Sequence, residues 1–195
     1  ESDLKHTLKF VRQDSEFIVQ EYVQKERDLL IYGGRMFDGK TILAGAMIRD
    51  RFADSGSASH GLMTNKIPNS VDINTISVFL ERIDYYGLFS FEYGMKGDNA
   101  YFFEVNLRND GTSHYFYQAG ANIPLAYVYS CVGLDYSKVN TNVIEDCRFI
   151  DEVFDIENVL KGTITRQQWK NDKNEATIFK YYDENDKRPW EIVKK

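Results

Sequence analysis

Residues 88–108 read LFSFEYGMKGDNAYFFEVNLR, and this stretch decides the fold that we expect. Aromatic and other apolar residues flank a polar turn at residues 96–99, which contains a Gly-Asp pair of the kind found in tight turns. We therefore predict two strands, at residues 88–95 and 100–108, joined as a hairpin. Because hairpin strands are antiparallel, the sheet that contains them is expected to be antiparallel.

The register of this hairpin decides whether it holds a functional site. With a turn of three residues, 97–99, Glu92 lies directly across from Glu104, and side chains at alternate positions share their face. A turn of two or four residues would place the two glutamates on opposite faces, and the site would not exist. The side chains expected together on one face are Glu92, Glu104, Asn106 and Arg108.

The expected face has the chemistry of a metal site. Directly opposed carboxylates lie about 5 Å apart at Cβ and repel each other, so a cation between them is favoured. Magnesium prefers oxygen ligands and binds through one or two carboxylates plus substrate phosphates. Asn106 adds a neutral oxygen, and Arg108 adds a positive charge suited to a developing negative one. The alternative is a solvated polar face on an edge hairpin, although such a face would be expected to include lysines.

The composition excludes several classes of protein. A net charge of -6 and a pI near 5.2 argue against a nucleic-acid partner, which would require a basic surface. The longest apolar run, residues 123–134, is too short to cross a bilayer and contains Pro124, so no membrane partner is expected. With only Cys131 and Cys147, a disulfide scaffold is not expected, and a reducing cytoplasm is the predicted location.

The remainder of the chain predicts an α+β fold, an antiparallel sheet with flanking helices. Residues 71–86 carry apolar side chains at helical spacing and precede Gly87, a residue type that often ends helices. Residues 114–134 are expected to be mostly helical, with a break near Pro124. The other expected strands cover residues 17–23, 29–37, 41–51 and 175–182, and the other expected helices cover residues 2–12, 149–160, 166–169 and 189–195.

The hairpin motif also resembles a known family. Glu92 and the run Glu104-Val105-Asn106-Leu107-Arg108 are similar to the signature of the ATP-grasp superfamily, in which an acidic residue precedes Glu-x-Asn-x-Arg on the return strand. The spacing is similar to that of biotin-carboxylase-like and carbamoyl-phosphate-synthase-like members. The resemblance implies that Glu92, Glu104 and Asn106 hold magnesium, or alternatively manganese, against the phosphates of ATP. It implies a catalytic role for Arg108 at the acyl-phosphate or the substrate.

The resemblance extends to a segment expected to bind adenine. Residues 18–23 are similar to the family's hinge strand, which holds adenine largely through backbone groups. The matching positions are Gln20, Glu21 and Val23. The acidic residue that the family places at the ribose hydroxyls is expected to be Asp28, with Glu26 as the alternative.

Three further positions match the family more loosely. Phe103 stands where a family residue often packs on adenine, or it is an ordinary core aromatic. Arg49 and Arg51 stand where the family has a basic residue facing phosphate or a substrate carboxylate. The loop at residues 54–61 is rich in small residues, and we expect it to cover the substrate.

The resemblance implies the C-terminal lobe of an ATP-grasp domain at residues 1–134, followed by a small extension at residues 135–195 similar to that of D-aspartate-ligase-like enzymes. Because the chain opens at Glu1, we expect it to be part of a longer protein whose N-terminal lobe is missing here. The implied activity is a carboxylate–amine ligase that uses ATP, a small carboxylate and an amine, with this fragment inactive alone. The alternatives are a non-catalytic nucleotide- or ligand-binding module, and a structural domain whose aromatic tail docks another protein.

Overall fold

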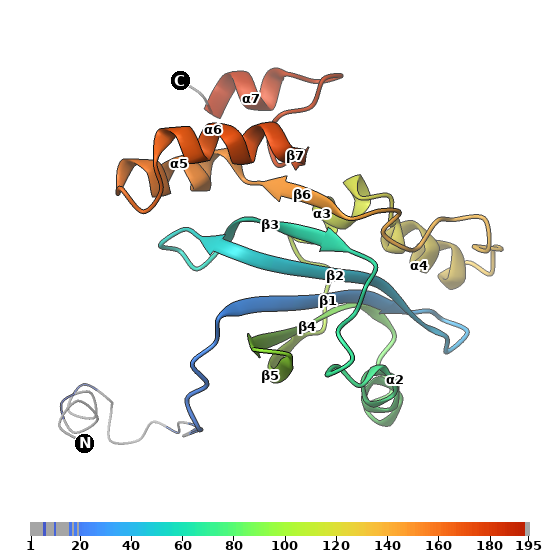
Figure 1. Cartoon of the computed structure of the whole chain (residues 1–195). Helices are drawn as coiled ribbons and strands as arrows, with labels where there is room; N and C mark the ends of the chain where they lie inside the picture. Colours follow the sequence, from blue (N-terminus) through green and yellow to red (C-terminus); the bar gives the residue numbers. More distant parts are fainter. Residues whose placement is uncertain (1–5, 7–9, 11–15, 17, 19, 194–195) are drawn as a thin grey trace.

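The computed structural model describes residues 6, 10, 16, 18 and 20–193, and these form a single sheet with helices on both faces (Figure 1). The sheet has seven strands in the order β5-β4-β1-β2-β3-β6-β7. The strands are β1 (Arg27–Arg35), β2 (Thr41–Phe52), β3 (Ala58–Thr64), β4 (Gly87–Lys96), β5 (Asn99–Asn106), β6 (Cys147–Ile150) and β7 (Ala176–Phe179). The helices are α2 (Ile73–Arg82), α3 (Ser113–Gln118), α4 (Ile123–Cys131), α5 (Glu152–Leu160), α6 (Arg166–Glu175) and α7 (Arg188–Val193).

Neighbouring strands are antiparallel, except that β6 and β7 run parallel. This confirms the predicted α+β class and the antiparallel sheet with flanking helices. None of the described helices is long and apolar enough to span a membrane.

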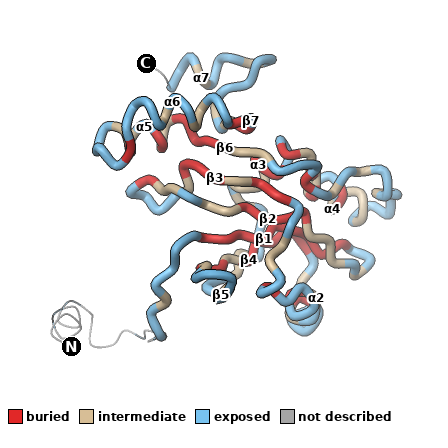
Figure 2. The backbone as a smooth tube through the Cα atoms, in the orientation of Figure 1, coloured by how far each residue is buried: buried red, intermediate tan, exposed pale blue. Residues whose placement is uncertain are grey.

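The core lies on both faces of the central strand β1, as the buried central segments in Figure 2 show. Leu30 and Tyr32 pack on one face with Phe116 of α3 and Ile123 of α4, and the Tyr32 and Phe116 rings stack at 4.9 Å. Residues 29 and 31 pack on the other face with helix α2. A strand covered on both faces must be apolar at consecutive positions, which explains the run Leu-Leu-Ile-Tyr in β1.

The hairpin of β4 and β5 has a different turn from the one predicted. Lys96 pairs with Asn99, so the turn contains two residues rather than three. A β-bulge then adds Phe103 to β5, and beyond it Glu92 lies across from Glu104. The three-residue turn was therefore wrong, but the opposed glutamates are confirmed because the extra residue in the bulge restores the register.

The N-terminal strand predicted at residues 17–23 is not found in the part of the chain that the structure describes. Gln20, Glu21 and Val23 lie outside any strand, and residues 17 and 19 lie outside the described residues. Pairing with β4 begins only where the Glu26 backbone N–H donates to the carbonyl of Met95 at 2.8 Å. A strand needs a neighbouring strand for its backbone groups, and none of the described strands pairs with Gln20–Val23, where the Val23 carbonyl accepts from the Lys25 N–H at 2.9 Å. Most of the helix predicted at residues 2–12 lies outside the described residues.

The tail differs from prediction at its start. Residues 147–150 form strand β6, which pairs with β3, so residues 149 and 150 lie in a strand and not at the beginning of a helix as predicted. The helix begins only after Asp151, whose side chain accepts a hydrogen bond from the Phe154 N–H at 3.1 Å. Helix α6 is also longer than the predicted residues 166–169. Strands β6 and β7 continue the same sheet as residues 27–106, and a division at residue 134 stays a prediction.

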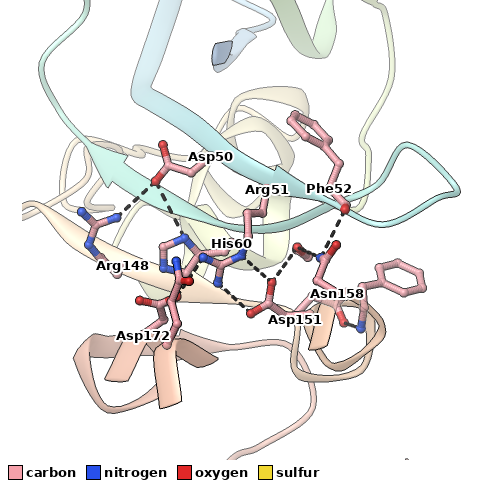
Figure 3. Close-up of polar contacts among 12 residues, drawn as sticks. Asp50, Arg51, Phe52, His60, Arg148, Asp151, Asn158 and Asp172 are labelled. Atoms are coloured by element: carbon pink, nitrogen blue, oxygen red, sulfur yellow. Dashed lines mark hydrogen bonds and ion pairs between the residues drawn. The ribbon is translucent and has the colours of Figure 1, made fainter. Parts of the chain in front are cut away.

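A largely buried network of hydrogen bonds and ion pairs connects α5 and α6 with β2 and β3 (Figure 3). Asp155 accepts hydrogen bonds from Arg51 Nε at 2.9 Å, from Arg51 Nη2 at 2.8 Å and from Ser59 Oγ at 2.8 Å. Arg51 Nη1 reaches Asp172 at 2.8 Å. Beside it, His60 is buried with neither ring nitrogen hydrogen-bonded, and burial lowers its pKa below the ordinary value.

Candidate functional site

Most of the polar residues singled out in the hairpin line one cavity of about 330 Å³ on the face of the sheet covered by α3. Leu30 of β1 pairs with both Met47 and Glu92, so these side chains share the face. The expected residues that line the cavity are Glu92, Glu104, Asn106, Arg108 and Arg49. A larger cavity, about 430 Å³, lies around Leu29 and Met95 and contains none of the expected site residues.

A chain of contacts connects the motif side chains. The Glu92 carboxylate accepts a short hydrogen bond from Arg49 Nη2 and another from Asn106 Nδ2 at 3.2 Å. Asn106 Oδ1 in turn accepts from Arg108 Nη2 at 3.3 Å. The side chains of Glu92 and Arg49 are only 20% and 12% exposed, so this ion pair is screened less than a surface pair.

Glu104 lies across from Glu92 on the edge strand β5 and is exposed. Two opposed carboxylates and the amide oxygen of Asn106 form a set of hard oxygen donors, which suits magnesium shared with phosphate oxygens. Among the described residues, no three or more His, Cys, Asp or Glu side chains gather as a metal-binding group, in keeping with a third donor that is an amide. The residues present therefore fit a magnesium ion that a substrate helps to hold.

The loop after β5 is tied to the sheet beneath it. Asp110 accepts hydrogen bonds from Ser90 Oγ at 2.6 Å and from the Thr112 N–H at 2.9 Å, while Asn109 accepts from Tyr32 at 3.0 Å. This loop leads into α3, where burial, with Asp151 nearby, raises the pKa of Tyr115 far above its usual value. Tyr115, which lines the cavity, is therefore neutral at ordinary pH.

Two segments far from the motif complete the cavity. The β2–β3 loop contributes Gly56 and Ser57, and the first residue of β3 contributes Ala58; all three lie within the segment expected to cover substrate. Lys180, directly after β7, contributes an ammonium group whose Nζ lies 2.7 Å from Asp151 Oδ2. No sequence pattern indicated a role for Lys180, because this residue stands near the end of an ordinary alternating strand pattern.

Arg51 and the expected adenine segment do not line this cavity. Arg51 is held in the buried network with Asp155 and Asp172. Gln20 and Glu21 are exposed ahead of β1, and Val23 is partly exposed there.

Asp28 and Phe103 lie in a neighbouring group around Lys25. Asp28 is buried and forms an ion pair with Lys25 at 2.6 Å. The Lys25 ammonium also lies 5.4 Å from the Phe103 ring centroid, and Phe103 packs over Gly94. Asp28 of β1 lies opposite Arg49 of β2 in the strand register, so the group around Lys25 adjoins the cavity that Arg49 lines.

Comparison with known proteins gives matches in structure only. No protein-family model matches the sequence, and no curated protein matches it. The phosphoribosylaminoimidazole carboxylase ATPase subunit of Aquifex aeolicus matches with a TM-score of 0.58 at 16% identity, over 74% of this chain and 48% of that chain. The N5-carboxyaminoimidazole synthetase of Staphylococcus aureus matches with a TM-score of 0.63 at 13% identity, over 83% and 44%. The same enzyme complexed with ADP matches with a TM-score of 0.61 at 14% identity, over 86% and 45%.

The chain thus spans less than half the length of each of these three solved enzymes. At such low identity the similarity concerns the fold, and it covers most of the sheet and its helices. The resemblance expected from the hairpin motif is confirmed at that level: this chain has the fold of part of the ATP-grasp enzymes.

Proposed function

We propose that this chain is the C-terminal part of a magnesium-dependent ATP-grasp ligase that activates a carboxylate and joins it to an amine. The observation that supports this most directly is one cavity lined by Glu92, Glu104, Asn106, Arg108 and Arg49, on a fold that resembles part of the ATP-grasp enzymes. Neither the motif nor the fold alone would support it as well.

The proposed chemistry has two steps. A carboxylate oxygen attacks the γ-phosphorus of ATP, the bond to the β,γ-bridging oxygen breaks, and ADP leaves with that electron pair. The amine nitrogen then attacks the acyl carbon, phosphate leaves, and the nitrogen loses a proton. No nucleophilic side chain is required, so the protein contributes positioning and charge.

Each cavity residue receives a role from its contacts. Glu92, Glu104 and Asn106 would hold magnesium, or manganese, which when bound neutralises the ATP phosphates. Arg108, an exposed neighbour of Asn106, would contact the acyl-phosphate oxygens or the substrate. Arg49 now neutralises Glu92, and it would turn to phosphate when the metal takes over that carboxylate.

The adenosine side is proposed around the Lys25 group. Phe103 would offer its ring to adenine, and the backbone of Gln20, Glu21 and Val23 would form the hinge. Asp28 would reach the ribose hydroxyls only after Lys25 releases it, because the two are now ion-paired. Arg51 has no part in this proposal, since two aspartates already hold it.

We also propose that the lobe at residues 1–134 and the extension at residues 135–195 act with a front lobe supplied by a longer protein. Catalysis by this chain alone is therefore not expected.

A second candidate function is a non-catalytic nucleotide-binding module of the same shape. The ion pair of Arg49 with Glu92 favours it, because a guanidinium already occupies part of the place where a cation is expected. The two candidates differ in turnover: only the ligase releases ADP in a manner that depends on a carboxylate substrate.

The test is calorimetric binding of ATP to the longer protein that contains this chain, with and without magnesium. We expect Glu104→Ala to weaken magnesium-dependent binding roughly tenfold or more, since it removes a contact to a charged group. Glu81→Ala, an exposed glutamate on α2, is the matched control and should bind as the wild type does. Unchanged binding in Glu104→Ala would refute the metal assignment, and magnesium-dependent ATP binding without any carboxylate-dependent release of ADP would favour the module.

A further inference from the structure

The segment directly after β7 brings a cation into the cavity from the edge of the sheet opposite to the glutamate hairpin. Strand β5, which carries Glu104, is one edge of the sheet, and β7 is the other. Glu104 and Lys180 nevertheless line the same cavity. The C-terminal segment is thus a wall of the site and reaches it at a position far from the metal ligands in the strand order.

A fully buried carboxylate holds the ammonium group of Lys180. Asp151 is 0% exposed, and its Oδ2 lies 2.7 Å from Lys180 Nζ. Asp151 is itself fixed at the start of α5, where it accepts from the Phe154 N–H. The ammonium group also lies 4.7 Å from the Phe154 ring centroid and 5.5 Å from that of Tyr181. The Lys180 side chain nevertheless stays 36% exposed, and of the three donors of its ammonium group one is directed to Asp151, so a further acceptor can be bound.

A second buried carboxylate fixes the backbone that carries Lys180. Glu152 is also 0% exposed, and it accepts hydrogen bonds from three successive backbone N–H groups. Its Oε2 accepts from residues 180 and 181 at 3.0 and 3.2 Å, and its Oε1 accepts from residue 182 at 2.8 Å. No Lys, Arg or His side chain within the described part of the chain forms an ion pair with Glu152.

Burial of a carboxylate without a cation is costly unless hydrogen bonds satisfy it fully. Here three N–H donors offset that cost, and their effect is to give residues 180–182 one backbone conformation. This arrangement sets the direction in which the Lys180 side chain leaves the chain. The hydroxyl of Ser57, which lines the cavity with Lys180, offers a further donor, whereas the Thr112 hydroxyl there already donates to Asp110.

We propose that Lys180 contacts an oxyanion of the substrate, a carboxylate or a phosphate, and that Glu152 is the positioning residue that sets Lys180 in place. This rests on the proposed function insofar as the cavity is taken to be the substrate site. It deepens that function by naming the substrate class: one of the two substrates presents a carboxylate or phosphate oxyanion to Lys180.

The test follows Lys180 directly in the 195-residue chain labelled with ¹³C-lysine. The Lys180 Cε resonance is assigned by its loss in Lys180→Met, and the chain is titrated with inorganic phosphate and, separately, with acetate. We expect a saturable shift of that resonance as the anion binds. In Lys180→Met, where anion binding is followed through other resonances of the chain, we expect binding to be about tenfold weaker. Saturation with phosphate alone identifies a phosphate-bearing substrate, and saturation with acetate alone identifies a carboxylate. Lys187→Met, an exposed lysine on the same segment, is the control and should bind normally.

The positioning role is tested with Glu152→Gln, which keeps one oxygen but turns an NH₂ group toward backbone donors. We expect the anion-induced shift of Lys180 to be lost or weakened about tenfold while thermal unfolding still shows a folded chain. Glu152→Asp, which keeps the charge but shortens the side chain, serves if the first variant does not fold.

Equal shifts at Lys180 and Lys187 would overturn the oxyanion contact, and a normal Lys180 response in folded Glu152 variants would overturn the positioning role. No nucleotide enters this experiment. A failure of magnesium-dependent ATP binding in the longer protein therefore counts against the proposed function alone, and an unresponsive Lys180 counts against this inference alone.

Discussion

The buried carboxylate of Asp155 allows a stability prediction to be worked from the contacts themselves. Asp155 is 0% exposed and accepts three hydrogen bonds, two from Arg51 and one from Ser59. The Arg51 side chain is only 15% exposed, and in Asp155→Ala it keeps Asp172 as its one remaining acceptor. The Ser59 hydroxyl loses Asp155 as its acceptor. The change thus removes one partner of a buried ion pair and leaves the other in place.

Removal of one partner from such a pair typically costs about 3–5 kcal/mol of folding free energy. For a chain of this length each kcal/mol lowers the melting temperature by roughly 2–4 °C, so a decrease of roughly 6–20 °C is expected. Asp172→Ala is the matched control, because Asp172 accepts a single bond from the same arginine and its side chain is 19% exposed. Its expected cost is about 1 kcal/mol.

Urea unfolding followed by circular dichroism measures both variants, with thermal unfolding as a second probe. A double variant, Arg51→Met with Asp155→Leu, should be less destabilised than Asp155→Ala, because replacing a buried ion pair with apolar side chains is often nearly neutral. Equal losses for the Asp155 and Asp172 variants, or a loss below about 1 kcal/mol for Asp155→Ala, would refute the reasoning.

Three further outcomes are expected. Burial lowers the pKa of His60, so the unfolded state binds a proton at this residue more readily than the folded state does. The unfolding free energy should therefore fall as the pH decreases from 7 through about 6.5. His60→Gln should reduce this pH dependence of the unfolding free energy, measured by urea unfolding between pH 7 and about 5. Gly61→Ala should cost about 1–3 kcal/mol, because a Cβ there meets a backbone carbonyl oxygen, whereas Gly111→Ala, in open space, should be neutral or slightly stabilising by the same assay. Glu104→Gln should stabilise the metal-free chain by about 0.5 kcal/mol, since it removes a like charge opposite Glu92, and the gain should disappear on adding magnesium.

The β4–β5 hairpin shows which features of the site sequence patterns predict and which they do not. The alternation of residues and the Gly-Asp turn predicted the strands and the opposed glutamates correctly. The turn was nevertheless two residues long, and only the bulge at Phe103 keeps Glu92 and Glu104 together. A bulge adds a residue without a characteristic residue type here, so periodicity alone does not reveal it.

Other parts of the site depend on contacts between distant segments. Lys180 follows a short strand whose place at the sheet edge is set by pairing with β6, and no local pattern reports that pairing. Arg51 was expected near phosphate or a substrate carboxylate because Arg49 and Arg51 stand where the ATP-grasp family has a basic residue. Irregular pairing of β2 with β3 on both sides of Arg51 separates them, and the buried Asp155 of α5 and the partly exposed Asp172 of α6 then determine the contacts of Arg51.

Strand β6 pairs with the outer edge of β3, and this pairing determines where the polypeptide can be truncated. From Met63 opposite Cys147 to His60 opposite Ile150, β6 occupies the outer backbone groups of β3. A fragment truncated at residue 134 would expose those groups as an open edge, and such edges recruit strands from other molecules. Self-association of that fragment would then report the cut and not the natural assembly, so expression boundaries should retain the chain at least through Phe179.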